Sequence, residues 1–393
     1  MYYSVVTAMP QSAQRWDVFC SVIDNFGDAG VCWRLARQLV AEHPLEVRLF
    51  VDALEALARI VPALDATRED QRVDGVQLRR WGGAQMELFI ADPGAAVIES
   101  FGCGLPESYL AAMAARDRQP AWINLEYLSA EAWIEGCHQL ASRHPRLPLT
   151  RHFFFPGFTA ASGGLLRERD LLACRDAFLA DPRAQGELWH KLGAVKPGAE
   201  TKIVSLFCYP QAPVASLLGA WTEGDERILC LVPDGVAVSA IDAWSSGAVR
   251  GVGRRITRGA LTLIRIPFLS QEDYDRLLWQ CDLSFVRGED SFVRAQWAAR
   301  PFVWQPYPQS ENAHRLKLEA FLELYAERLP SDAEEALRAF CSAWNGEADA
   351  GASWGALTRA LGELRAYAED WAEGLAALRD LASNLVKFCA DRV

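Results

Sequence analysis

The sequence lacks the cysteine and histidine patterns of a disulfide framework or a zinc site. Its ten cysteines contain no C-x-x-C pair, and its six histidines show no ligand spacing. Several cysteines stand inside apolar runs, such as Cys208 in IVSLFCY and Cys230 in ILCLV. Free cysteine in such runs behaves as a small buried hydrophobe, so the pattern favours a reduced compartment.

The chain also lacks a basic block, a membrane-length apolar run and a secretory leader. The net charge is −11, and no basic stripe of the kind that nonspecific nucleic-acid binders carry is present. No apolar stretch approaches the roughly 18–20 residues that a membrane span needs. The N-terminus shows no basic segment followed by an apolar one. These absences exclude a basic nucleic-acid binder and predict a cytoplasmic location.

The length, the hydrophobic content and the alternating pattern of the sequence predict two α/β domains. A chain of 393 residues, 51% of them hydrophobic, exceeds one ordinary core. Two alternations of strand and helix are expected, at 1–165 and 190–360, and a helical C-terminus of about 365–393 is expected to return to the first domain. Two αβα layers facing a central cleft make a GT-B-like fold the leading prediction. The expected strands are 18–23, 46–51, 75–80, 96–99, 121–124, 203–208, 227–232, 261–266, 283–286 and 302–304, and 144–164 is expected to be a long ordered loop.

The most informative segment is Trp16 to Val40, WDVFCSVIDNFGDAGVCWRLARQLV. A buried strand is followed by a short polar loop and then by a helix whose outer face carries Arg34, Arg37 and Gln38. In doubly wound sheets ligands bind at the carboxyl ends of the strands, where this loop places Asp24 and Asp28. Both carboxylates are candidates for chemistry. The alternative is structural, with Asp28 capping the helix and Asp24 forming an Asx turn.

A second polar segment, CDLSFVRGEDSFVRAQWAAR, begins at Cys281. A strand ending near Val286 leads into a helix expected at 291–299, a geometry that binds phosphate through free backbone N–H groups. Arg287 can grip a diphosphate, and Ser291 can cap the helix or donate to a phosphate oxygen. Glu289 and Asp290 are better suited to accept from sugar or ribose hydroxyls, or from Ser and N–H groups. An ordinary capped helix with a surface Arg–Glu pair is the alternative.

Aromatic residues follow the neighbouring strands of the second half. A nucleotide base needs flat apolar faces and a few edge hydrogen bonds, and these residues can supply both. Each aromatic taken alone is better explained as core. The pair Asp273 and Asp275 resembles a D-x-D metal motif, but it lies within a helical pattern expected at 271–280. The residues expected around the base are Phe207, Tyr209, Phe268, Gln271, Tyr274 and Tyr307.

Three long strings carry a family resemblance over nearly the whole chain. They are WDVFCSVIDNFGDAGVCWRLARQL, then INLEYLSAEAWIEGCHQL with HFFFPGFTAASGGLLRE, and finally FVRGEDSFVRAQWAARPFVWQPYPQSENAH. In these strings the chain resembles the elongation factor P arginine rhamnosyltransferases, which are bacterial GT-B glycosyltransferases. The resemblance implies transfer of L-rhamnose from dTDP-β-L-rhamnose to an arginine of elongation factor P, with inversion and without a metal.

The resemblance also implies residue roles. Asp28 matches the catalytic carboxylate, with Asp24 also important. The first domain would bind the acceptor and the second would bind the donor. Positions that match the family's donor site are Phe207, Tyr209, Phe268, Gln271, Arg287, Glu289, Asp290, Ser291 and Tyr307.

Chemical reasoning does not decide which role belongs to Asp24 and which to Asp28. A guanidinium stays protonated far above neutral pH and is a poor nucleophile, so two carboxylates are suitable here, one to orient it and another to accept its proton. Asp28 is the expected base and Asp24 the orienting partner, although the roles could be reversed. Glu289 could assist catalysis from the donor side. Competing functions are another GT-B-like enzyme, such as a nucleotide-sugar epimerase or a small-molecule glycosyltransferase, and a non-catalytic translation-factor binding protein.

Overall fold

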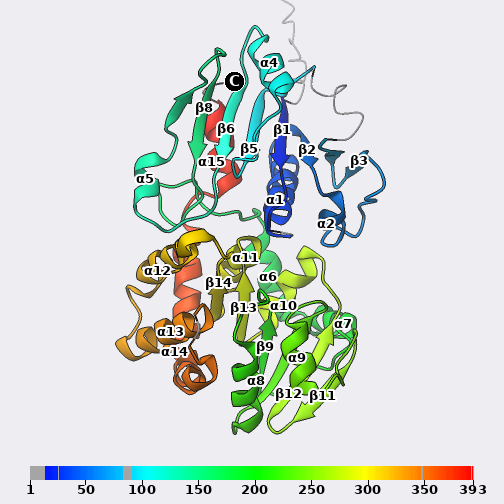
Figure 1. Ribbon diagram of the computed structural model, residues 1–393, viewed down its shortest axis with the longest axis vertical. Coiled ribbons are helices and arrows are strands. Elements are labelled where there is room, and N and C mark those ends of the chain that lie inside the picture. Colours follow the sequence, from blue (N-terminus) through cyan, green and yellow to red (C-terminus); the bar gives the residue numbers. More distant parts are fainter. Residues whose placement is uncertain (1–13, 25, 83–90, 347, 391, 393) are drawn as a thin grey trace, which may run out of the picture.

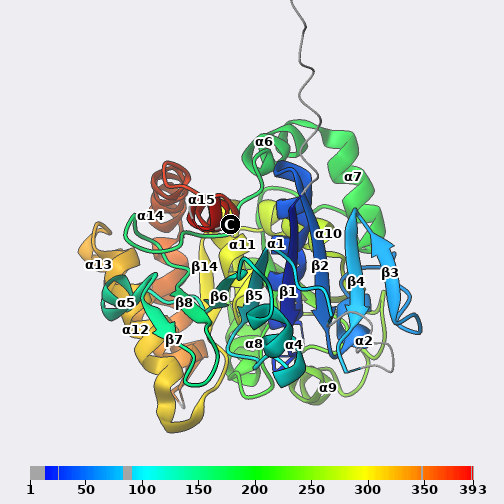
Figure 2. The same ribbon diagram turned by 90° about the horizontal axis from the view of Figure 1, so that it is seen from above.

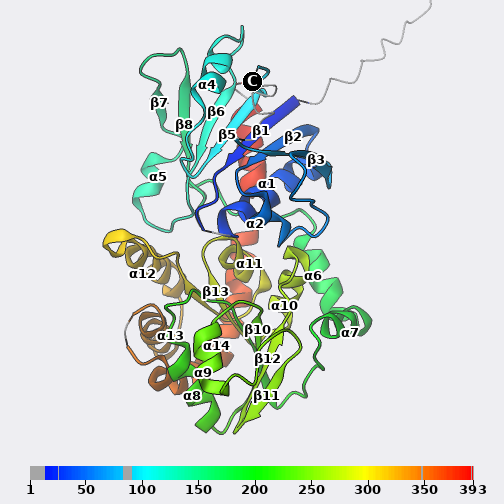
Figure 3. The same cartoon turned by 45° about the vertical axis from the view of Figure 1, so that its right-hand side comes forward.

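The computed structural model describes the chain apart from residues 1–13, 25, 83–90, 347, 391 and 393. It contains two sheets, the first in the upper half and the second in the lower half of the molecule (Figures 1 and 3). Within the described ranges, no helix has both the length and the apolar character of a membrane span.

The first sheet has eight strands in the order β3-β4-β2-β1-β5-β6-β8-β7 (Figure 2). Its six inner strands are parallel, and β3 and β7 pair antiparallel at the edges. Inner strands buried on both faces are continuous apolar runs, which is why the sequence pattern predicts most of them. The bounds are β1 Gln14–Cys20, β2 Leu45–Val51, β3 Asp70–Val73, β4 Val76–Arg80, β5 Ala96–Ser100, β6 Ala121–Leu125, β7 Ala141–Arg143 and β8 Thr150–Phe154.

The second sheet has six strands in the order β11-β12-β10-β9-β13-β14, with only the edge strand β11 antiparallel. One apolar cluster continues from the first sheet into the second, and a smaller cluster lies beneath α4. The bounds are β9 Thr201–Leu206, β10 Arg227–Pro233, β11 Arg255–Arg258, β12 Leu261–Ile266, β13 Leu283–Arg287 and β14 Phe302–Gln305.

The helices connect and cover the two sheets. In chain order they are α1 Gly27–Glu42, α2 Leu54–Ala58, α4 Glu107–Ala114, α5 Trp133–Cys137, α6 Leu171–Ala180, α7 Pro182–Lys191, α8 Val214–Glu223, α9 Val238–Ser245, α10 Gln271–Gln280, α11 Asp290–Ala298, α12 Ala313–Ala326, α13 Ser331–Trp344, α14 Ala350–Ala376 and α15 Leu381–Ala390. The 3-10 turn η1, Ser310–Asn312, precedes α12.

The C-terminal helices span both halves of the molecule (Figure 1). The long α14 packs against α8, α11 and α13 beside the second sheet. The chain then crosses back, and α15 lies against β8, where the ring of Phe388 contacts His152 and Phe154. The backbone N–H of Leu381 donates to the carbonyl of Leu165 at 2.9 Å. The last helix therefore ties the C-terminus to the first sheet.

The strand order places the loop after β1 and the loop after β13 at equivalent positions in their two sheets. Strands β1 and β5 are neighbours whose connections run to opposite sides of the first sheet, and β9 and β13 have the same relation in the second. Such a switch in strand order opens a crevice at the carboxyl ends of the strands. The loop between β1 and α1 and the loop between β13 and α11 both lie at such a point.

Some predicted boundaries were wrong. The segment 144–164, expected to be a loop, contains β8, which pairs with β6 inside the first sheet. Its sequence, TRHFF, has only one β-branched residue and is mostly half-buried, so it carries no strand pattern. The edge strands β3, β7 and β11 were missed because polar edge strands resemble loops. The first strand ends at Cys20, earlier than expected.

Candidate active site

The loop after β1 holds Asp28 by its backbone. Helix α1 begins at Gly27, and its N-cap residue Phe26 makes no side-chain cap hydrogen bond. Asp28 lies in the first turn, and its Oδ2 accepts from the backbone N–H groups of Ile23 and Asp24, both at 2.8 Å. The carboxylate therefore stabilises the loop that precedes the helix. It does not occupy the N-cap position that the structural alternative assigned to it.

Asp24 joins the two halves of the molecule. The hydroxyl of Tyr209, which follows β9, donates to Asp24 Oδ2 at 2.5 Å. Gly27 and Gly288 make this approach possible, because a Cβ at either position would lie 2.6 Å from the same oxygen. Gly288 also has φ of +61°, which disfavours other residues. A side chain at either position would therefore displace the Asp24 carboxylate from this place.

Arg287 stands at the end of β13 with its guanidinium over two aromatic rings. Its Cζ lies 4.4 Å from the Phe207 ring centroid and 4.6 Å from that of Tyr209. One N–H donates to the carbonyl of Cys208 at 3.1 Å. Among the described residues no carboxylate forms an ion pair with Arg287. This cation is therefore available to an anionic ligand.

Ser291 does not cap the helix, which was one of the two roles expected of it. Helix α11 begins one residue earlier, at Asp290, with Glu289 in the N-cap position. The Ser291 hydroxyl donates to the carbonyl of Arg287 at 2.6 Å and accepts from its N–H at 3.0 Å. It therefore secures the strand-to-helix turn that carries Arg287, and it does not cap the helix.

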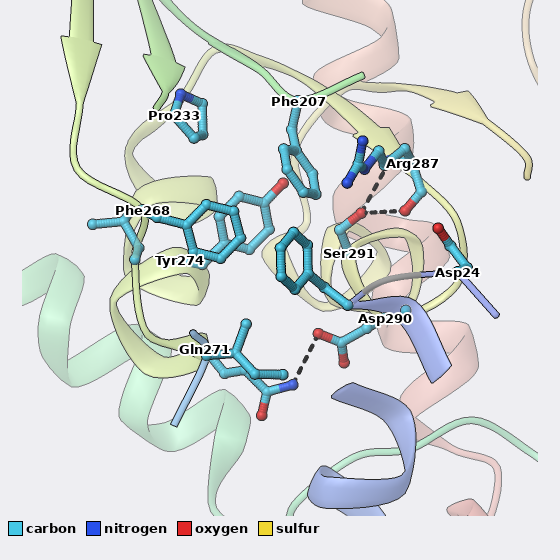
Figure 4. A pocket seen from close by; sticks show the side chains of 13 residues that line it. Asp24, Phe207, Pro233, Phe268, Gln271, Tyr274, Arg287, Asp290 and Ser291 are labelled. Carbon is cyan, nitrogen blue, oxygen red and sulfur yellow. Dashed lines mark hydrogen bonds between the residues drawn. The ribbon is translucent and has the colours of Figure 1, made fainter. Parts of the chain in front are cut away.

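A pocket of about 590 Å³ opens beside Arg287 (Figure 4). Its aromatic wall comes from the second half, with the Phe207 centroid 6.3 Å from Phe268 and 5.7 Å from Tyr274. The first half also contributes, since Phe26 lies 4.8 Å from Phe268. Of the residues singled out from the sequence, the pocket brings together Asp24, Phe207, Phe268, Gln271, Tyr274, Arg287, Asp290 and Ser291.

Asp290 and Gln271 bond across to α1. Asp290 accepts from Arg34 Nε at 2.7 Å and from the Gln271 amide at 3.1 Å. That amide also donates to the carbonyl of Gly30 at 3.1 Å. The carboxylate expected to accept from sugar hydroxyls is therefore bound to protein groups in this structure, and it links the pocket to the opposite half.

Arg34, which the helical pattern places on the polar face of α1, is buried. It is only 4% exposed, and it also pairs with Asp275, which pairs in turn with Arg294. Gln38, on the same face, is buried as well. Helical periodicity puts these side chains outward, but α10 and α11 cover Arg34, and Gln38 donates to the Arg167 carbonyl and to Asp380 just before α15. No local pattern reveals the position of these segments. The D-x-D string lies inside α10 as expected, with Asp275 engaged in these ion pairs.

A second pocket, of about 750 Å³, lies on the other side of the same loop. Asp24 and Gly27 line both pockets, so the two pockets meet at this loop. Glu289 lines only this second pocket, and its Oε1 accepts from the backbone N–H of Leu128 at 2.8 Å. The lining also contains Asp28, Tyr127, Tyr307 and Lys317. Tyr209, expected beside the base, is in the lining of neither pocket, and its ring centroid lies 5.6 Å from that of Tyr307.

The three carboxylates of this region share a raised pKa. Burial raises the pKa of Asp24 and of Asp28, although hydrogen bonds partly offset the effect. Burial, together with the nearby charges of Asp28 and Asp24, raises the pKa of Glu289 to about 8, and Lys317 opposes this. With a pKa of about 8, Glu289 can exchange a proton near neutrality, which general acid–base chemistry requires.

Tyr127 and Lys317 are site residues that the sequence analysis missed. Tyr127 lies within the quoted string INLEYLSAE, but an isolated tyrosine after a strand carries no functional pattern. Lys317 belongs to α12, far away in sequence. No cluster of His, Cys, Asp and Glu arranged to hold a metal is found in the part of the chain that the structure describes.

Comparisons with known proteins agree with one another. The family model described as Elongation-Factor P (EF-P) rhamnosyltransferase EarP matches residues 16–390. A protein-arginine rhamnosyltransferase of Pseudomonas putida is 49% identical over 374 residues, which cover 95% of this chain and 98% of that protein. A solved structure concerned with EarP-mediated arginine glycosylation of translation elongation factor EF-P is 36% identical, has a TM-score of 0.69 and covers 97% of this chain and 100% of its own.

A glycosyltransferase from Rickettsia africae shares the fold alone. It is 6% identical, with a TM-score of 0.52 over 97% of this chain and 98% of its own. Together with the two sheets and the long C-terminal helix, these likenesses confirm the GT-B-like arrangement that the sequence predicts.

Proposed function

The chain belongs to the elongation factor P rhamnosyltransferase family and is a protein-arginine rhamnosyltransferase, and from this premise we propose that it transfers L-rhamnose from dTDP-β-L-rhamnose to an arginine of elongation factor P with inversion. The observation that supports this proposal most directly is that two pockets share lining residues. Asp24 and Gly27 border both the aromatic, cation-bearing pocket and the carboxylate-lined pocket. A donor in one and an acceptor in the other would meet at this loop.

The first pocket suits a nucleoside diphosphate sugar. Phe207, Phe268 and Tyr274 offer apolar faces to a base. The planar guanidinium of Arg287 can donate two parallel hydrogen bonds to a phosphate group, and the N-terminus of α11 adds the positive end of a helix dipole. As the bond to the sugar breaks, these groups would stabilise the charge that develops on the leaving diphosphate.

The second pocket suits the acceptor guanidinium. We assign Asp28 as the base and Asp24 as the orienting partner. A raised pKa makes a carboxylate a better base near neutrality, which favours proton removal as the new C–N bond forms. Inversion requires the nucleophile and the leaving group on opposite sides of the anomeric carbon, so the acceptor in this pocket would attack the sugar from the side away from the diphosphate. Glu289, also in this pocket, would share the proton transfer.

The proposal extends to the domains and the cellular location. The first domain, 1–165, would hold the acceptor, and the second, 190–360, the donor, with the helix at about 365–393 joining the first. Because the proposed acceptor acts in translation, we place the protein in the cytoplasm.

Intact-mass spectrometry of elongation factor P tests the proposal. Incubation with this protein and dTDP-β-L-rhamnose is expected to add one deoxyhexose to a single arginine. Asp28→Asn is expected to abolish the gain while calorimetry shows that the donor still binds. Asp332→Asn, at an exposed position on α13, is the matched control and is expected to react normally. Donor consumption without a mass gain, or complex formation without one, would refute the proposed transfer.

A further inference from the structure

The segment that follows β6 contacts carboxylates from both halves of the molecule. The backbone N–H of Leu128 donates to Glu289 Oε1 at 2.8 Å. The hydroxyl of the preceding residue, Tyr127, interacts with Asp28 and lowers the pKa of that carboxylate. Two adjacent residues thus hold Asp28 and Glu289 from the same side of the second pocket.

The ring of Tyr127 is arranged to carry a cation. Phe101 is stacked on it, with centroids 4.4 Å apart and an interplanar angle of 12°, so one face is covered by a rigid neighbour. The ammonium of Lys317 lies over the ring, 5.3 Å from its centroid. Since Phe101 fills one face, the ammonium takes the face that borders the pocket.

Lys317 reaches that face from a partly exposed position on α12. It is half-buried, its neighbour Leu316 is 61% exposed, and its side chain has four rotatable bonds. Its positive charge lowers the pKa values of Glu289 and Glu126. The pocket therefore already balances its carboxylates with one cation on the Tyr127 ring.

We propose that Tyr127 positions the acceptor arginine, whose guanidinium takes the place of the Lys317 ammonium on the ring and points its N–H groups at Asp28 and Glu289. The inference rests on the proposed function and names an acceptor-positioning residue for it. A guanidinium is planar and stacks on aromatic rings while its edge donates hydrogen bonds, which an ammonium cannot do. The arrangement therefore selects arginine over lysine.

Steady-state kinetics with elongation factor P as the varied substrate test this role. Tyr127→Leu removes the ring and is expected to raise the acceptor KM about tenfold. The dissociation constant of dTDP-β-L-rhamnose, measured by calorimetry, is expected to stay the same, because Tyr127 does not line the donor pocket. A purely structural role would disturb both constants together.

Tyr127→Phe separates the ring from the hydroxyl. The acceptor KM is expected to remain within about twofold, since the ring is kept. Loss of the hydroxyl raises the pKa of Asp28, so the acidic limb of the kcat profile is expected to move to higher pH. This variant also keeps the test decisive if Tyr127→Leu fails to fold.

Lys317→Met tests the exchange of cations. Removing the competing ammonium is expected to lower the acceptor KM at least about twofold. Lys387→Met, at an exposed position on α15, is the control for the change of net charge and is expected to leave the KM unaltered.

The outcomes separate the two proposals. If the unaltered protein adds no deoxyhexose, the proposed function fails. If it does, but Tyr127→Leu keeps a normal acceptor KM or loses donor affinity in parallel, only the role of Tyr127 is overturned. An acceptor KM that rises in Lys317→Met would likewise show that Lys317 is not displaced.

Discussion

Replacing Glu289 by glutamine is expected to change the pH dependence of stability. Burial raises the pKa of this carboxyl from 4.5 to about 8 in the folded protein. Between these values the unfolded chain has released the proton and the folded chain still holds it. Folding then takes up a proton, so the stability of the wild type falls as the pH rises through this window.

The size of the effect follows from the pKa values. A proton taken up on folding is worth about 1.4 kcal/mol per pH unit. From roughly pH 5.5 to pH 8.5 the full effect would reach about 3 kcal/mol. Because Glu289 is only half-buried, we expect about half of this. Glutamine keeps an oxygen for the Leu128 N–H and carries no titrating proton, so Glu289→Gln gains stability relative to the wild type as the pH rises.

Urea unfolding of both proteins across this pH range measures the difference directly. The control is Glu319→Gln, at an exposed position on α12, which reports the change in net charge alone. A stability difference between Glu289→Gln and wild type that stays flat over the range, or shrinks with rising pH, would refute the raised pKa. It would also remove Glu289 as a proton carrier near neutrality.

Three further predictions concern other parts of the site. Arg34→Met leaves the buried Asp275 short of a partner, so urea unfolding should show a loss of about 3–5 kcal/mol, and a loss below about 1 would contradict the role of this ion-pair network. Gly288→Ala places a Cβ 2.6 Å from Asp24 Oδ2, so the rate of rhamnose transfer should fall at least about tenfold, and a normal rate would show that the Asp24 contact is dispensable. Arg287→Lys keeps the charge but loses the planar fork, so donor affinity measured by calorimetry should fall about tenfold, whereas an unchanged affinity would place the diphosphate elsewhere.

The sequence predicts well those parts of the fold that depend on local pattern. Helix α10 has the expected bounds, Gln271–Gln280, because a capping serine precedes it and its apolar spacing is regular. Most inner strands of both sheets are apolar runs that the pattern predicts. The domain boundaries at 165 and 190 remain a prediction. Where the apolar signal is weak, as in β8, the expectation of a loop was wrong.

The two polar clusters could also be located from the sequence. Asp24 and Asp28, and Arg287 to Ser291, each follow a buried strand, and strand ends at a topological switch point meet in space. Their partners could not be located in this way. Asp290 bonds to Arg34 across more than two hundred residues, and nothing near either position encodes the pairing.

The sequence by itself therefore determined the strongly patterned helices and strands, the GT-B-like class and the strand ends that carry charged side chains, since these depend on periodicity, turn chemistry and family-specific strings. Only the tertiary structure decided that Asp24 lines two pockets, that Arg34 is buried, and that Tyr127 and Lys317 stand beside Asp28 and Glu289. Those relations depend on how the two sheets pack against each other. Burial and distance, which set the pKa values of the carboxylates, exist only after that packing has formed.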